Sequence, residues 1–149
     1  MYNSFDDTMN HIEKVTIYIG KIIEGLIYRG AVHDRSKLSD PEKEIFDIYT
    51  PKLKDVTYGS DKYKEYLKEM KIALDHHYSQ NRHHPEYFEN GIKDMDLLDL
   101  IEMICDWYAA SQRHAKGDIM KSIEMNQERF GYSDELKQIL KNTIISLKG

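Results

Sequence analysis

The sequence is short of the features that mark secreted, membrane-spanning and fibrous proteins. Its 149 residues contain one cysteine, Cys105, so no disulfide can form within the chain. Only three prolines occur, and no linker rich in proline or serine interrupts the sequence. No hydrophobic run approaches the ~20 apolar residues that a membrane-spanning helix requires. We therefore expect a soluble globular protein with no membrane partner.

An excess of positive charge is also lacking. The net charge is -5, so broad binding to a nucleic-acid backbone is not expected, although a local basic pocket for one small phosphate stays open. The chain is 40% hydrophobic and 32% charged, as in globular proteins, and its length favours one domain over residues 1–149. It begins Met1-Tyr2-Asn3 with acidic residues at Asp6 and Asp7, unlike a signal peptide, which favours a cytoplasmic location.

Hydrophobic spacing and breaking residues predict helices throughout the chain. Gly30, Pro51 and Gly131 are expected to limit helices. A short turn of helix is expected at Pro85, and no alternating strand pattern is visible. The predicted helices cover about 8–28, 41–49, 60–78, 95–110, 117–130 and 133–147. The pattern indicates an all-α, single-domain bundle of six or seven helices.

Histidines and carboxylates recur in an order that suits a metal site. Six of the seven histidines precede two acids on an apolar segment. Imidazole nitrogens and carboxylate oxygens are ligands for borderline to hard divalent metals. The series is His11, His33-Asp34, His76-His77, His83-His84, Glu102 and Asp106. It makes a metal-dependent enzyme the leading hypothesis.

The two acids lie on the most apolar helix, over about 97–110. Glu102 and Asp106 are four residues apart and share a face, and Arg113 nearly continues that line. An ionised carboxylate is costly to bury without a partner. Asp106 therefore needs a metal, an arginine or several hydrogen bonds, and an ion pair of either acid with Arg113 or another arginine is an open alternative.

Helical phase separates some of the histidines. His11 is four residues before Val15 on the apolar stripe of its helix, where a hydrogen-bonded core histidine is the alternative to a ligand. His77 follows Leu74 by three residues and faces inward, whereas His76 is rotated by about 100°. We therefore favour His77 over His76 as a ligand.

Phase gives no answer for the remaining histidines. His83 and His84 lie in an expected loop, where a solvated turn or a surface metal site is an alternative. His114 follows the apolar helix and suits a favourable charge near a helix C-terminus better than a ligand.

Taken together, these positions resemble the HD-domain superfamily of metal-dependent phosphohydrolases. The resemblance spans residues 11–106 and implies an all-α bundle whose metal is held by a histidine, a His-Asp pair and a later aspartate. Those ligands match His11, His33, Asp34 and Asp106. Many members insert further histidines that hold a second metal, and His77 with His83 or His84 matches this insertion.

A lysine three residues after the pair's aspartate is also common in that superfamily, and Lys37 matches it. The stretches 76–88 and 102–107 also look like a family of small uncharacterised bacterial and phage proteins. If the protein is phage-encoded, this likeness implies the host cytoplasm as its location. It implies no substrate, and landmarks for particular nucleotides are not visible.

The resemblance implies a phosphohydrolase or phosphodiesterase acting on a small phosphorylated substrate, with a nucleotide as the expected class. One or two divalent ions are expected, of manganese, iron, magnesium, cobalt or zinc. Asp34 would hold the metal, and Glu102, or a histidine of the loop that is not a ligand, would act as a general base or orient a ligand. Lys37 and Arg113 are candidates to contact the phosphate.

Three alternatives stay open at this stage. A dimetal iron oxygenase on the same scaffold would consume oxygen. A non-catalytic phage or bacterial module would bind a nucleotide or a host protein without turnover. Purely structural histidines would leave the purified protein without metal. The oligomeric state is not indicated by the sequence.

Overall fold

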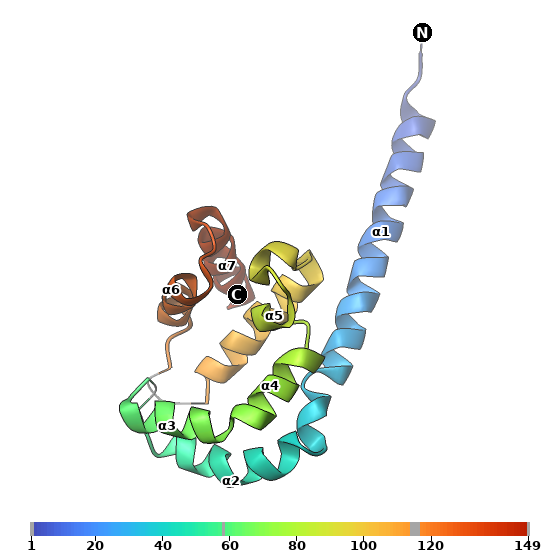
Figure 1. Cartoon of the computed structure of the whole chain (residues 1–149). Helices are drawn as coiled ribbons and strands as arrows, with labels where there is room; N and C mark the ends of the chain where they lie inside the picture. Colours follow the sequence, from blue (N-terminus) through green and yellow to red (C-terminus); the bar gives the residue numbers. More distant parts are fainter. Residues whose placement is uncertain (1, 58, 114–116, 149) are drawn as a thin grey trace. The chain divides into compact units, whose positions relative to one another are not determined.

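The computed structural model describes residues 2–57, 59–113 and 117–148, and these form two compact units, residues 1–33 and 34–149. The single-domain expectation stays a prediction. Seven α-helices and three 3-10 turns, with no strand, make up the described residues (Figure 1). The predicted all-α fold is confirmed.

The first unit is one long helix, α1 (Phe5–Val32). Asp6 and Asp7 lie in its first turn and Arg29 in its last turn, the charge order that complements a helix dipole. Gly30 lies inside this helix, so its prediction as the end was wrong. A glycine near a helix end costs only about 1 kcal/mol relative to alanine, which a 28-residue helix accommodates.

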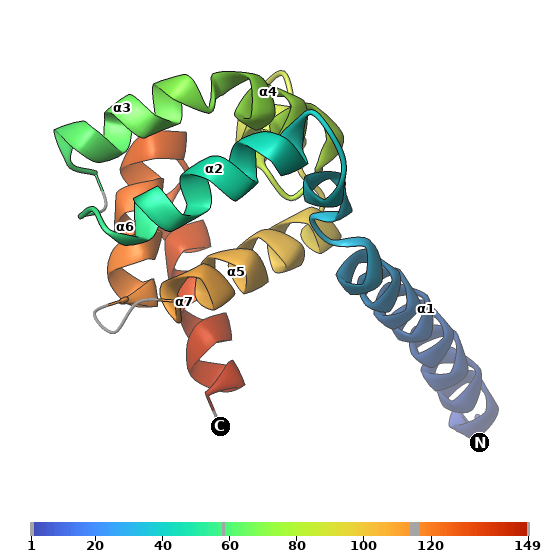
Figure 2. The same ribbon diagram turned by 90° about the horizontal axis from the view of Figure 1, so that it is seen from below.

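The second unit opens with a 3-10 turn and three helices that pack against one another. These are η1 (Arg35–Leu38), α2 (Glu42–Lys54), α3 (Asp61–Glu69) and α4 (Lys71–Gln80). Helix α2 lies beside α3 and α4 in both ribbon views (Figure 2). This packing sets the first turn of α2 against α4.

Two breaks in this region differ from the prediction. Pro51 lies within α2 rather than ending it, and the helix continues for three more residues. The helix expected over 60–78 is two helices that meet at Met70, which is buried with 1% of its surface exposed. Burying Met70 at the junction lets both helices contribute to the same packed layer.

The rest of the unit carries the hydrophobic core. Two 3-10 turns, η2 (Pro85–Tyr87) and η3 (Gly91–Asp94), lead into α5 (Leu97–Ser111), α6 (Ile119–Phe130) and α7 (Asp134–Leu147). Gly131 adopts the left-handed conformation that ends α6, as predicted. The buried core residues are Met103, Ile104, Ile119, Ile123, Tyr132, Leu140 and Ile144.

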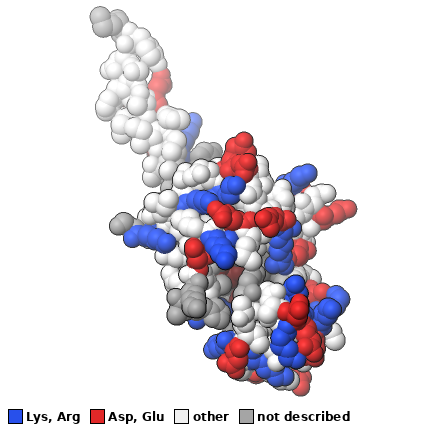
Figure 3. All heavy atoms as spheres, turned by 90° about the vertical axis from the view of Figure 1, so that its left-hand side faces the viewer, with Lys and Arg blue, Asp and Glu red and all other residues white. Residues whose placement is uncertain are grey.

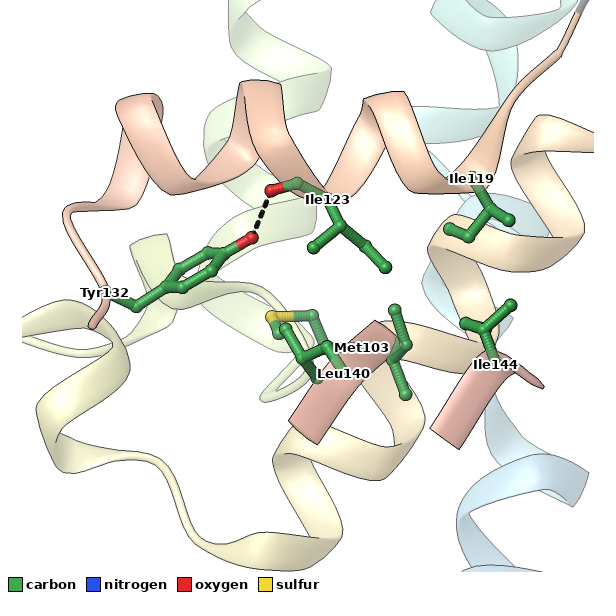
Figure 4. Close-up of a cluster of buried hydrophobic side chains, with 7 residues drawn as sticks. Met103, Ile119, Ile123, Tyr132, Leu140 and Ile144 are labelled. Atoms are coloured by element: carbon green, nitrogen blue, oxygen red, sulfur yellow. Dashed lines mark hydrogen bonds between the residues drawn. The ribbon is translucent and has the colours of Figure 1, made fainter. Parts of the chain in front are cut away.

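Figure 4 shows how this core closes around α5. Met103 faces Ile123 and Leu140 from the neighbouring helices, and the Tyr132 hydroxyl donates to the Ile123 carbonyl. Burial raises the pKa of Tyr132 to about 12. The core therefore fixes α5, the helix that bears Glu102 and Asp106.

Positive and negative side chains are mixed on the visible face of the second unit. On the face of the second unit in Figure 3, Lys and Arg side chains alternate with Asp and Glu, and the described residues form no continuous basic area there. None of the described helices is long and apolar enough to cross a bilayer.

Candidate metal centre

Asp34 begins the second unit in an unusual backbone conformation. Its φ of 55° is left-handed, which aspartate adopts more readily than most residues. The Asp34 carbonyl accepts from the Lys37 amide at 2.9 Å, so the turn η1 follows at once. The two side-chain oxygens have different neighbours: Oδ2 accepts from Lys37 Nζ at 2.6 Å, and Oδ1 faces two imidazole rings.

Three histidines converge on Asp34. One ligand atom from each of Asp34, His77, His83 and His84 lies within 4.8 Å of every other. Asp34 Oδ1 is 3.3 Å from His77 Nε2 and 3.5 Å from His83 Nε2. His77 Nε2 is 2.9 Å from His84 Nε2. His77 and His83 are each 2% exposed, so the cluster is enclosed.

The far side of the His77 ring is held by a buried acid. His77 Nδ1 lies 2.9 Å from Glu42 Oε2, and Glu42 has no exposed surface. Two acceptors at that distance need a proton between them, which assigns N–H to Nδ1 and the lone pair to Nε2. Asn81 Nδ2 also lies close, but its hydrogens are directed to the Ser36 hydroxyl and the His77 carbonyl, both at 2.8 Å.

His83, in the loop after α4, repeats this arrangement with an acid from another helix. Its Nδ1 lies 3.2 Å from Glu102 Oε1 on α5, while Nε2 faces Asp34. A histidine that ligates a metal usually donates its other ring N–H to a carboxylate or carbonyl, which fixes the tautomer. The structure contains two such carboxylate–histidine pairs, and both direct Nε2 to the same oxygen of Asp34.

This arrangement sets acceptor atoms against one another. The lone pairs of His77 Nε2 and His83 Nε2 face an aspartate oxygen at 3.3 and 3.5 Å, longer than normal N–H···O hydrogen bonds. A hydrogen bond from His84 to His77 would account for their 2.9 Å contact without a metal. It would not account for the direction of His83. A cation held among the four atoms would offer a partner to each of them.

The surroundings of His77 and His84 favour the neutral ring that ligation requires. Burial lowers the pKa of His77, with Lys37 as the next contribution. Burial, followed by the neighbouring His83 and His77, lowers the pKa of His84 to about 3. Neutral imidazole has one lone pair to offer. Three nitrogens and one carboxylate oxygen form a donor set that suits zinc, manganese, iron or cobalt better than calcium.

Other predicted residues lie near this cluster. A ring nitrogen of His83 and a carboxylate oxygen of Asp106 are within 4.8 Å of each other. Helical phase is confirmed for the adjacent histidines: His77 is buried, while His76 has 37% of its side chain exposed and contacts Glu42 Oε1 at 2.7 Å. His83 and His84, which phase could not separate, both join the cluster.

The other predicted residues are placed as follows. Arg113 is exposed in the turn after α5, and Glu102 contacts His83. An ion pair with Arg113, the open alternative, is therefore not needed to explain the position of Glu102. His11 lies within α1, and His33 ends that helix, so both belong to the first unit and their ligand roles stay predictions. His114 is outside the described residues.

Sequence reasoning missed Glu42. The motif Ser39-Asp40-Pro41-Glu42 predicts a helix start, and an acid in the first turn of a helix is ordinarily a solvated group. Its burial follows from the packing of α2 on α4, which no local pattern reveals.

Comparison with known proteins identifies the family but no activity. Residues 1–146 match the model of a family of unknown function, DUF5662, and the chain belongs to this family. No curated protein and no solved structure matches the chain. The resemblance to the HD-domain superfamily therefore stays a prediction, and the clustered residues carry the functional proposal.

Proposed function

We propose that this protein is a divalent-metal-dependent phosphohydrolase or phosphodiesterase that acts on a small phosphorylated substrate. The observation that carries the proposal is the convergence of Asp34, His77, His83 and His84, with two buried rings oriented by carboxylates. The superfamily resemblance adds the expected substrate class, a nucleotide.

The residues of the cluster have different proposed roles. Asp34, His77, His83 and His84 would hold the ion, with Asp106 beside them. When bound, a divalent ion lowers the pKa of a coordinated water and polarises a phosphoryl oxygen. Glu102 is engaged with His83 Nδ1, so orienting that ring is a role its position supports directly.

Lys37 lies beside the proposed ion site. Its Nζ is 2.6 Å from Asp34 Oδ2 and 5.2 Å from the centroid of the Phe46 ring. An ammonium has no lone pair and cannot ligate a metal, but it donates to phosphoryl oxygens. Lys37 is therefore proposed to stabilise negative charge on the phosphate. Arg113 stays a proposed phosphate contact on sequence grounds alone.

The iron oxygenase keeps its place as a second candidate, because imidazole and carboxylate donors also suit iron. A protein that binds nucleotide without turnover would use the same cluster. These candidates differ in metal identity, oxygen consumption and phosphate release.

The test is a screen of the manganese-loaded protein on nucleotides, phosphomonoesters and phosphodiesters, with released phosphate as the measurement. A chelator should abolish turnover. Lys37→Ala should keep the metal and lower kcat/KM by about 10- to 100-fold, which corresponds to ~1.4–2.8 kcal/mol. Lys43→Ala is the matched control, because Lys43 pairs with exposed Asp47 on the same unit.

One result would contradict the proposed activity, and another would contradict the role of Lys37. Metal-loaded protein that releases no phosphate from any compound, but consumes oxygen when loaded with iron, would favour the oxygenase. Full activity of Lys37→Ala would remove this lysine from the site.

A further inference from the structure

We infer that Glu42 is a positioning residue of the metal centre, which fixes the tautomer and direction of His77 and thereby sets the affinity for the ion. This inference rests on the proposed metal site and assigns a role to a residue outside the ligand set. Three features of its surroundings support it: complete burial, two-sided hydrogen bonding, and contact with the ring nitrogen opposite the cluster.

Burial makes the Glu42 carboxylate an unusual feature of α2. It has no exposed surface, although glutamate is rarely buried without partners. An isolated buried charge is strongly unfavourable, so donors must compensate for the lost water. Ser36 Oγ donates to Oε2 at 3.1 Å, and the histidine contacts supply the other donors.

The carboxylate is fixed from both sides. His76 Nδ1 lies 2.7 Å from Oε1, and His77 Nδ1 lies 2.9 Å from Oε2. Asn81 further anchors this group by donating to the Ser36 hydroxyl and the His77 carbonyl. Glu42 therefore cannot turn away from His77 without breaking contacts with three residues.

A purely structural role would use the same contacts to join α2 to α4. Such a role requires only that Glu42 accept hydrogen bonds, and it is indifferent to which nitrogen of His77 bears the proton. A positioning role requires the proton on Nδ1, because only then does Nε2 direct its lone pair to Asp34. The tautomer and the ion affinity therefore separate the two roles.

Glutamine is the informative replacement because it keeps the size of the side chain and removes its charge. Its amide offers one acceptor oxygen and one donor nitrogen, while the two histidines present two N–H groups. In one of the two contacts, the glutamine NH2 group would therefore face a histidine N–H group, and no hydrogen bond could form. Loss of such an orienting partner typically weakens metal affinity by about 10- to 100-fold.

The experiment titrates the metal-free full chain with Co²⁺, following the visible absorption of the bound ion. Dissociation constants are measured by competition with a chelating dye. Glu42→Gln should bind Co²⁺ about 10- to 100-fold more weakly than wild type, with an altered visible spectrum. Glu44→Gln is the control, because it makes the same charge change at an exposed position of α2 and should bind as wild type does.

A second measurement needs no variant. The ¹⁵N shifts of the His77 ring in metal-free wild type report its tautomer, and N–H at Nδ1 is expected. N–H at Nε2, or equal Co²⁺ affinity and spectra for Glu42→Gln and wild type, overturns the inference while leaving the metal centre in place. Wild type that binds no Co²⁺ overturns both the inference and the proposed function, so the two failures are distinguishable.

Discussion

Asp34 shows how one residue can combine two tasks in a small site. Its left-handed backbone allows a tight turn into η1, so that Lys37 returns to Oδ2 while Oδ1 stays directed at His77 and His83. The lysine offsets part of the carboxylate charge without competing for Oδ1. Local backbone geometry thus brings a candidate ligand and a candidate phosphate contact together.

The lowered histidine pKa values predict how the metal-free protein responds to acid. His77 and His84 take up protons more readily in the unfolded chain, whose histidine pKa is 6.5, than in the folded one. The free energy of unfolding should therefore fall as the pH drops below about 6.5. For His84 this fall continues towards its folded pKa of about 3.

Chemical denaturation of the metal-free protein between pH 7.5 and 5 would check this sign. These limits lie about one unit above and 1.5 units below the 6.5 of an unshifted histidine. His84→Gln is the comparison, because it removes one of the two shifted groups and should flatten the slope. A wild-type slope of zero, or stability that rises towards acid, would contradict neutral, buried rings.

Only some of the site residues could be predicted from the local spacing of residues in the sequence. Helical phase distinguished His77 from His76, because burial of one helix face repeats every three to four residues. It could not rank His83 and His84 in a loop, nor reveal Glu42, whose burial depends on packing between helices distant in sequence. Resemblance supplied Asp34 and Asp106, and the structure supplied the partners that orient the rings.

At the scale of elements, the loop bearing His83 and His84 is tied to the start of α5. Arg82 donates to both oxygens of Asp99, at 3.1 and 2.9 Å, and Asp99 is fully buried. Asp99 also accepts from the Asp96 amide in the capping box of the helix. The same acid therefore starts α5 and holds the residue next to His83.

Breaking this pair should destabilise the protein more than breaking an exposed one. Arg82→Ala removes the cation from a buried carboxylate, and because the Arg82 side chain is itself 44% exposed, the free energy of unfolding should fall by about 1–3 kcal/mol. Arg129→Ala removes the Arg129–Glu86 pair, whose side chains are 51% and 27% exposed, and should cost only about 0–1 kcal/mol. Urea denaturation measures both, and equal losses would contradict the anchoring role of Arg82.

The bounds of a helix could be predicted where capping residues and apolar spacing agree. They were predicted less well where the expected end rested on a glycine or proline alone. Ser133 and Asp118 cap α7 and α6 as their positions indicate. Gly30 and Pro51 weaken a helix locally but do not end it when the flanking residues favour helix. The break at Met70 carries no glycine or proline, and Met70 is buried there, so no local breaking residue marks it.

At the scale of the whole molecule, the family match covers both units, whereas the cluster lies in the second. All four clustered residues come from segments of residues 34–84, and Glu102 on α5 joins them to the hydrophobic core. The ligand roles of His11 and His33, from the first unit, are a separate prediction. The second unit alone supplies four candidate ligands, enough for one tetrahedral ion.

The most direct measurement is the metal content of purified protein by elemental analysis, for wild type, His77→Ala and His76→Ala. The proposed centre predicts at least one divalent ion per wild-type chain, loss of metal in His77→Ala, and retention in His76→Ala. These two histidines are adjacent in sequence, but only His77 faces Asp34. Wild-type metal content in His77→Ala, or loss confined to His76→Ala, would contradict the centre described here.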